Sequence, residues 1–151
     1  MKKTIGYYIE NFSGYFLGCI IMAISYEYWD KFKLIYNTQF LDKIISISTT
    51  LFGFLLTILT LIVQSDSPTV SIMKQHGSYR KLILFNKTIV IACISNCILS
   101  LALSFTQNLI ISKCYPLFEF ATILNIGIFT VALFNTIIFT LIFYKILISG
   151  E

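Results

Sequence analysis

The residues of this sequence with the most regular spacing are neutral, small and polar. They occupy one apolar segment in alternating steps of four and three, which places them on one face of an α-helix. We call them the polar stripe: Ser46, Thr50, Gly53, Thr57, Thr60 and Gln64. In lipid, small residues let helices approach closely, and hydroxyl or amide groups bond across the contact. The polar stripe is therefore expected to face protein or water rather than lipid.

Little else in the chain could catalyse a reaction. An ionisable side chain inside a membrane span would be a functional site by default, but the apolar segments have none in their interior, and Glu27 comes closest at the edge of the first. His76 is the only histidine, and neither HExxH nor cysteine-pair spacing surrounds it. The sequence predicts a non-enzymatic protein without a metal, a cofactor or a small-molecule substrate.

Three other apolar segments carry weaker sets of small and polar residues at helical spacing. Each set predicts one contact face on its helix, and the first includes a GxxxG. These residues are Asn11, Gly14, Gly18 and Ser25 in the first segment, Ala92, Asn96, Ser100, Ser104 and Gln107 in the third, and Thr122, Asn125, Ala132 and Thr136 in the fourth. Both packing within a helix bundle and lining of a polar path stay open as roles for all four sets.

Composition indicates that these segments meet lipid. The chain is 57% hydrophobic and 12% charged, with a mean hydropathy of +0.84, whereas a soluble domain has roughly 25% charged residues. A membrane-spanning helix needs about 20 mostly apolar residues, and four segments are candidates: 11–29, 44–64, 88–112 and 120–144. We expect an all-α polytopic membrane protein with four transmembrane helices in one domain, residues 1–151.

Basic residues set the expected orientation, because Lys and Arg gather on the cytoplasmic side. One side would hold Lys2, Lys3, Lys74, Arg80, Lys81, Lys87 and Lys145, and the other Lys31, Lys33, Lys43 and Lys113. Both termini are therefore expected in the cytoplasm, with the chain in the bacterial inner membrane. The net charge of +4 is spread between the apolar segments rather than over one face, which argues against direct nucleic-acid binding.

The connection 65–87 is the only sizeable cytoplasmic piece. Ser67 and Pro68 suit the start of a short helix, and Gly77 suits its end. Basic and aromatic residues follow, and we expect them to dock a cytoplasmic partner with an acidic surface: Lys74, His76, Tyr79, Arg80 and Lys81.

The four cysteines do not form an obvious disulfide framework. Cys19, Cys93 and Cys97 lie inside apolar segments and are expected to be buried free thiols. Cys114 lies in a short connection, where an intermolecular disulfide stays open.

The stretch 51–57, continued to Gln64 and Ser65 and then by 77–82, resembles small four-span bacterial membrane proteins of anti-phage defence loci, in particular the KwaA family of the Kiwa system. The resemblance covers about residues 44–112. It implies a membrane-embedded homo-oligomer that senses infection at the envelope and works with a cytoplasmic DNA-binding effector. It transfers no catalytic residues.

Two other functions fit the same residues. One is a small homo-oligomeric pore or membrane-disrupting effector lined by Thr50, Thr57, Thr60 and Gln64. The other is an immunity protein against a toxin or bacteriocin, since a short polytopic chain without catalytic groups also fits that role.

Overall fold

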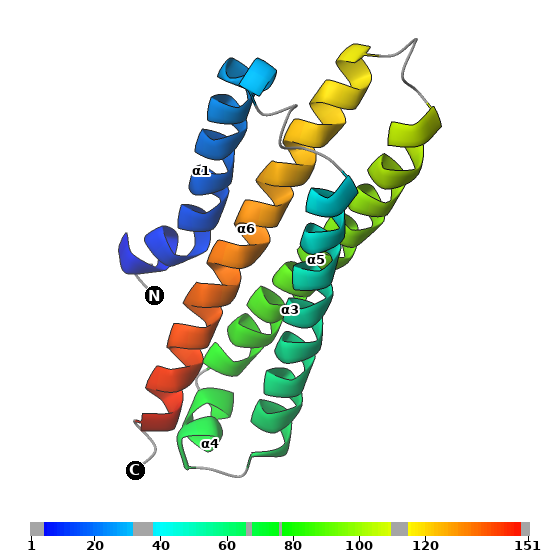
Figure 1. Cartoon of the computed structure of the whole chain (residues 1–151). Coiled ribbons are helices and arrows are strands. Elements are labelled where there is room, and N and C mark those ends of the chain that lie inside the picture. The colour runs from blue at the N-terminus through cyan, green and yellow to red at the C-terminus, as the bar shows by residue number, and fades with distance from the viewer. Residues whose placement is uncertain (1–4, 32–37, 66–67, 76, 110–114, 149–151) are drawn as a thin grey trace.

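The computed structural model describes residues 5–31, 38–65, 68–75, 77–109 and 115–148. Every element in these ranges is an α-helix (Figure 1): α1 (Ile5–Glu27), α3 (Thr38–Gln64), α4 (Pro68–Gln75), α5 (Ser78–Leu109) and α6 (Tyr115–Ile148). The all-α fold expected from the sequence is therefore confirmed.

Three of the helices have the length and composition of membrane spans. They are apolar over Thr38–Gln64, Tyr79–Thr106 and Pro116–Lys145, and at about 1.5 Å per residue each exceeds the roughly 30 Å of a bilayer's hydrocarbon core. This indicates an integral membrane protein. The first predicted segment lies in α1, whose described apolar part is the shorter stretch Phe12–Glu27, with a rise of roughly 24 Å.

The helices are not arranged as four equivalent neighbours. α3, α5 and α6 pack on one another, with the contact between α3 and α6 the smallest of the three, while α1 packs on α6. Figure 1 shows α6 between α1 on one side and α3 and α5 on the other. Among the described residues, α1 thus lies at the periphery of the bundle and packs mainly on α6.

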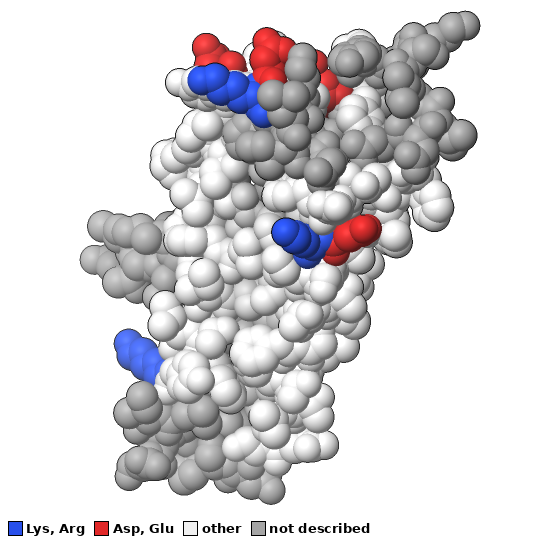
Figure 2. Space-filling model, viewed as in Figure 1, with Lys and Arg blue, Asp and Glu red and all other residues white. Residues whose placement is uncertain are grey.

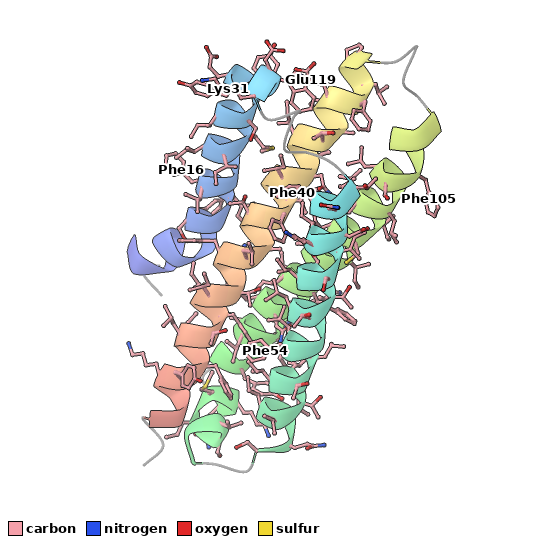
Figure 3. All side chains as sticks on the ribbon, in the orientation of Figure 1. Phe16, Lys31, Phe40, Phe54, Phe105 and Glu119 are labelled. Carbon is pink, nitrogen blue, oxygen red and sulfur yellow. The ribbon has the colours of Figure 1, made fainter. Side chains whose placement is uncertain are left out.

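The core of the bundle divides into two groups of apolar side chains. The larger joins α3, α5 and α6 through residues such as Leu55, Ile89 and Phe139, and the smaller lies around Leu41 and Leu103. Large apolar side chains also cover the outside, where Phe16 and Phe105 point away from the bundle (Figure 3). An apolar exterior of this kind suits lipid as the surrounding solvent.

The short helix α4 connects α3 to α5 as the sequence predicts. It begins at Pro68, whose fixed φ suits a first helical turn, and it ends at Gln75. Gly77 follows with a φ of 70°, a left-handed conformation that costs glycine far less than other residues. Val70 is buried against the bundle, so α4 is anchored where α5 begins.

Charge separates the two ends of the bundle. Glu27, Asp30, Lys31 and Glu119 lie at the end where α1 stops and α6 starts, as the labels of Lys31 and Glu119 show in Figure 3. Asp42 and Lys43 lie in the second turn of α3, and Figure 2 shows acidic side chains at the α1 and α6 end and one about halfway along the molecule. The α4 end carries only basic residues among its described charged side chains: Lys74, Arg80, Lys81, Lys87 and Lys145.

Candidate functional site

A cluster of four polar side chains joins the three long helices near the middle of the bundle. Ser48 comes from α3, Asn96 and Ser100 from α5, and Asn125 from α6, and each is completely buried. They lie together because the facing sides of these helices each carry a polar residue at the same level. We call this set the central polar cluster.

Hydrogen bonds connect every member of the central polar cluster. Asn125 donates through Nδ2 to Oδ1 of Asn96 at 3.1 Å and to Oγ of Ser100 at 2.8 Å. Asn96 in turn donates through Nδ2 to Oγ of Ser48 at 3.0 Å. An amide buried in hydrocarbon is costly without partners, so this network favours one relative placement of α3, α5 and α6.

A second inward amide ties α5 to the backbone of α3. Asn86 is fully buried and donates through Nδ2 to the carbonyl oxygen of Leu55 at 3.1 Å. Nearer the other end, the thiol of Cys97 lies 3.7 Å from Oγ1 of Thr49 and 3.9 Å from the carbonyl oxygen of Ile45. The α3–α5 contact therefore has polar interactions at two levels, one at Asn86 and one at Cys97.

The contact between α1 and α6 depends on close packing at glycines. A Cβ at Gly14 would collide with the side chain of Asn135, and one at Gly18 would lie 2.5 Å from Cγ2 of Val131 and 3.2 Å from the carbonyl oxygen of Gly127. A Cβ at Gly127 would in turn meet Met22. The two helix backbones thus approach closely, as small residues permit in membranes.

The same contact contains polar atoms without a hydrogen-bond partner. Among the described residues these include Oγ of Ser25, Oγ1 of Thr122 and Oδ1 of Asn135, and all three side chains are buried. An unpaired buried polar atom costs about 1–3 kcal/mol. The α1–α6 contact is therefore well fitted in shape and poorly satisfied in hydrogen bonding.

The polar stripe lies elsewhere, on the outer surface of α3. All six of its residues are exposed, and no atom lies within 4 Å of a Cβ built at Gly53. The hydroxyls of Thr50, Thr57 and Thr60 donate to the carbonyl oxygens four residues earlier, at 2.8–2.9 Å. The inward face of α3 is a different one, formed by Leu41, Ile44, Ser48, Leu55, Ile58 and Ile62.

The weaker sets predicted from the sequence lie mostly inside the bundle. Buried members are Gly14, Gly18 and Ser25 of α1, Asn96 and Ser100 of α5, and Thr122, Asn125, Ala132 and Thr136 of α6. Ala92 and Ser104 are half-buried, and the side chains of Asn11 and Gln107 are outside the described set. The most regular pattern in the sequence thus faces outward, and the less regular ones meet other helices.

Three inward polar residues, Ser48, Asn86 and Asn135, were absent from the predicted faces. The amides could have been found from residue type alone, because asparagine is rare in hydrocarbon-facing positions. Ser48 gives no such signal, since a serine can bond to its own helix.

The expected docking residues are divided between two helices. Lys74 of α4 places Nζ 5.5 Å from the ring centroid of Tyr79, a cation–π contact, while Arg80 and Lys81 are exposed in the first turn of α5. His76 lies outside the described residues.

Comparisons of the chain with protein-family models, with curated proteins and with solved structures give no match.

The described part of the chain contains no group of three His, Cys, Asp or Glu residues that could hold a metal ion. Cys19, Cys93 and Cys97 are free thiols, but Cys19 is exposed on α1 rather than buried as expected. Cys114 lies outside the described ranges. The polar groups that the central polar cluster brings together are amides and hydroxyls.

Proposed function

We propose that this chain is a non-enzymatic membrane subunit that acts by assembling with further copies of itself through the polar stripe of α3. The observation that carries the proposal is the outward position of that stripe, with open space over Gly53. A glycine within a helix costs about 1 kcal/mol relative to alanine, and no close neighbour among the described residues requires a glycine at Gly53. Close approach of a helix from another copy would use it.

In this proposal four helices cross the bilayer and both termini face the cytoplasm. The basic α4 end supports that orientation, because positive residues favour the cytoplasmic side. The short apolar part of α1 would need flanking residues or a thinned bilayer to complete its crossing.

The assembly would serve as a sensor and scaffold of a bacterial anti-phage defence system. The support for this setting is the resemblance over residues 44–112. A cytoplasmic effector with an acidic surface would dock at Lys74, Tyr79 and Lys81, which share the α4 end of the bundle.

The mass of the purified chain in nanodiscs tests the assembly. The wild-type chain is expected to give a multiple of the single-chain mass, and Gly53→Leu is expected to shift it towards one copy because the added side chain fills the contact. Ala102→Leu is the matched control, since Ala102 is also exposed, on the outer face of α5, and it should keep the wild-type mass. A single-copy mass for the wild-type chain would refute the proposal.

The docking surface has its own test. The product of the adjacent gene should co-purify with the wild-type chain and be lost from the variant with Lys74→Glu and Lys81→Glu, whereas Lys31→Glu at the opposite end should retain it. Undiminished co-purification with the double variant would refute docking at the α4 end.

A pore is the second candidate, and the hydroxyl-bearing outer face of α3 favours it. Rings of Thr50, Thr57 and Thr60 could line a polar path between several copies. Under activating conditions a potential-sensitive dye should then report depolarisation, which Thr57→Leu should reduce. Unchanged polarisation in cells with the wild-type chain would leave the scaffold as the function.

The immunity-protein alternative predicts instead that the chain protects its host from a toxin encoded beside it.

A further inference from the structure

The outer face of α5 carries a continuous row of apolar side chains. Leu84, Ile91, Ile94, Ile98, Leu101 and Phe105 are all exposed, and a first step of seven followed by steps of three and four places them on one side of the helix. In a membrane this side faces the acyl chains of the surrounding lipid. We call it the lipid row.

Two basic residues lie on the same side of α5 as the lipid row, near its α4 end. Lys87 lies between Leu84 and Ile91, each of which is 51% exposed, and Arg80 lies one turn before Leu84. Arg80 and Lys87 are seven residues apart, so they point in nearly the same direction from the helix axis. Both are exposed.

No acidic side chain among the described residues accompanies these cations. The described carboxylates belong to the end of α1 and the residues just after it, the second turn of α3 and the start of α6, away from Arg80 and Lys87. A lysine on a lipid-facing helix side is costly at membrane depth unless its ammonium reaches the headgroup layer. Lys87 therefore needs an anion supplied from outside the described chain, at the level where phospholipid phosphates lie.

The geometry of a helix allows both cations to meet one phosphate layer. Seven residues span roughly 10 Å along the axis, and helical side chains lean towards the N-terminus. The long stem of Lys87 can therefore extend towards the level of Arg80, with its methylene groups along apolar surface and its ammonium among the headgroups.

We propose that Arg80 and Lys87 form a binding site for an anionic phospholipid whose acyl chains lie along the lipid row. The phosphate lies between the guanidinium and the ammonium, and Leu84 and Ile91 contact the first part of the acyl chains. This site does not depend on self-assembly or on the defence role proposed above, and it assigns Arg80 to lipid rather than to the docking of a soluble partner.

Native mass spectrometry of the purified full chain in detergent tests the site by titration with dioleoyl phosphatidylglycerol and dioleoyl phosphatidylcholine. Each cation near a membrane surface contributes about a fivefold gain in affinity for anionic lipid. Arg80→Gln or Lys87→Gln should therefore weaken phosphatidylglycerol binding about fivefold, and the double variant roughly 25-fold. Phosphatidylcholine binding should not change.

The matched control removes two positive charges from the other end through Lys31→Gln and Lys43→Gln. It should bind phosphatidylglycerol like the wild-type chain, and an equal loss in this control would overturn the site in favour of a general charge effect. Wild-type affinity in the Arg80 and Lys87 double variant would also overturn it. If the double variant does not fold, Lys87→Gln against the charge-preserving Lys87→Arg decides, because only the latter should retain binding.

A soluble headgroup separates a lipid site from a free-anion site. Glycerol 3-phosphate has the same phosphate chemistry without acyl chains, so it should not displace phosphatidylglycerol at equal concentration. Displacement at equal concentration would show that the lipid row adds nothing and would overturn the proposal.

Discussion

Asn125 of α6 donates a hydrogen bond to Asn96 of α5, with 3.1 Å between Nδ2 and Oδ1. Because Asn96 uses its own Nδ2 to reach Ser48 of α3 at 3.0 Å, the same amide links three helices. Loss of the Asn125 side chain would remove the hydrogen bonds that Oδ1 of Asn96 and Oγ of Ser100 accept from it inside the bundle.

The first prediction concerns the stability of this link. Asn125→Ala should lower the free energy of unfolding by about 1–3 kcal/mol, because Oδ1 of Asn96 and Oγ of Ser100 lose a donor. Unfolding by sodium dodecyl sulfate in mixed micelles measures this loss. Thr130→Val, which removes a hydroxyl that donates to the carbonyl oxygen of Ile126 within α6, should change stability by less than about 0.5 kcal/mol. Equal unfolding curves for Asn125→Ala and the wild-type chain would contradict the link.

The second prediction concerns the close contact between α1 and α6 at Gly18. Gly18→Leu should displace α1 from α6, since even a Cβ at this position meets Val131 and the backbone of Gly127. Spin labels on the native Cys19 and on Ile137→Cys, both exposed, with the other cysteines replaced by alanine, measure the separation by pulsed electron paramagnetic resonance. The distance distribution should broaden in Gly18→Leu and stay narrow in Gly53→Leu. A narrow distribution in both variants would contradict the close glycine contact.

The third prediction compares two buried threonines of α6. Oγ1 of Thr122 has no partner, whereas Oγ1 of Thr136 donates to the carbonyl oxygen of Ala132 at 2.7 Å. Replacement by the equally large valine should therefore raise stability at residue 122 by about 1 kcal/mol and leave it unchanged or lower it at residue 136. Thermal unfolding in detergent measures both, and a lower melting temperature for Thr122→Val would show that its hydroxyl is in fact satisfied.

A fourth prediction concerns orientation. In a background without native cysteines, Lys31→Cys should react from outside intact cells with a membrane-impermeant maleimide, because the mixed-charge end should face outward. Lys74→Cys at the basic end should react only after permeabilisation. The reverse pattern would invert the proposed topology.

Much of the fold follows from the sequence because the bilayer imposes strict rules. Backbone groups in hydrocarbon must be paired, so long apolar segments become helices, and Pro68 and Gly77 mark the ends of α4 through their backbone geometry. The peripheral place of α1 was not predictable, since periodicity defines a contact face without naming the helix that it meets.

The outward position of the polar stripe has a specific physical reason. A threonine in a helix can donate its hydroxyl to the carbonyl four residues earlier, as Thr50 and Thr57 do, so it tolerates lipid without an external partner. Every asparagine whose side chain is described, namely Asn86, Asn96, Asn125 and Asn135, is buried. Asparagines therefore indicate the inward side of these helices more reliably than regularly spaced hydroxyls do.

In the sensor proposed above, the central polar cluster would limit which stimuli act at this level of the bundle. Its amides and hydroxyls neither titrate near neutral pH nor carry net charge. A shift of α3, α5 and α6 at Ser48, Asn96 and Asn125 would take up no proton and move no charge through the transmembrane voltage. In the proposed sensor, a signal that rearranges the bundle at this level would act mechanically, through bilayer thickness, lateral pressure or the shape of a neighbouring molecule.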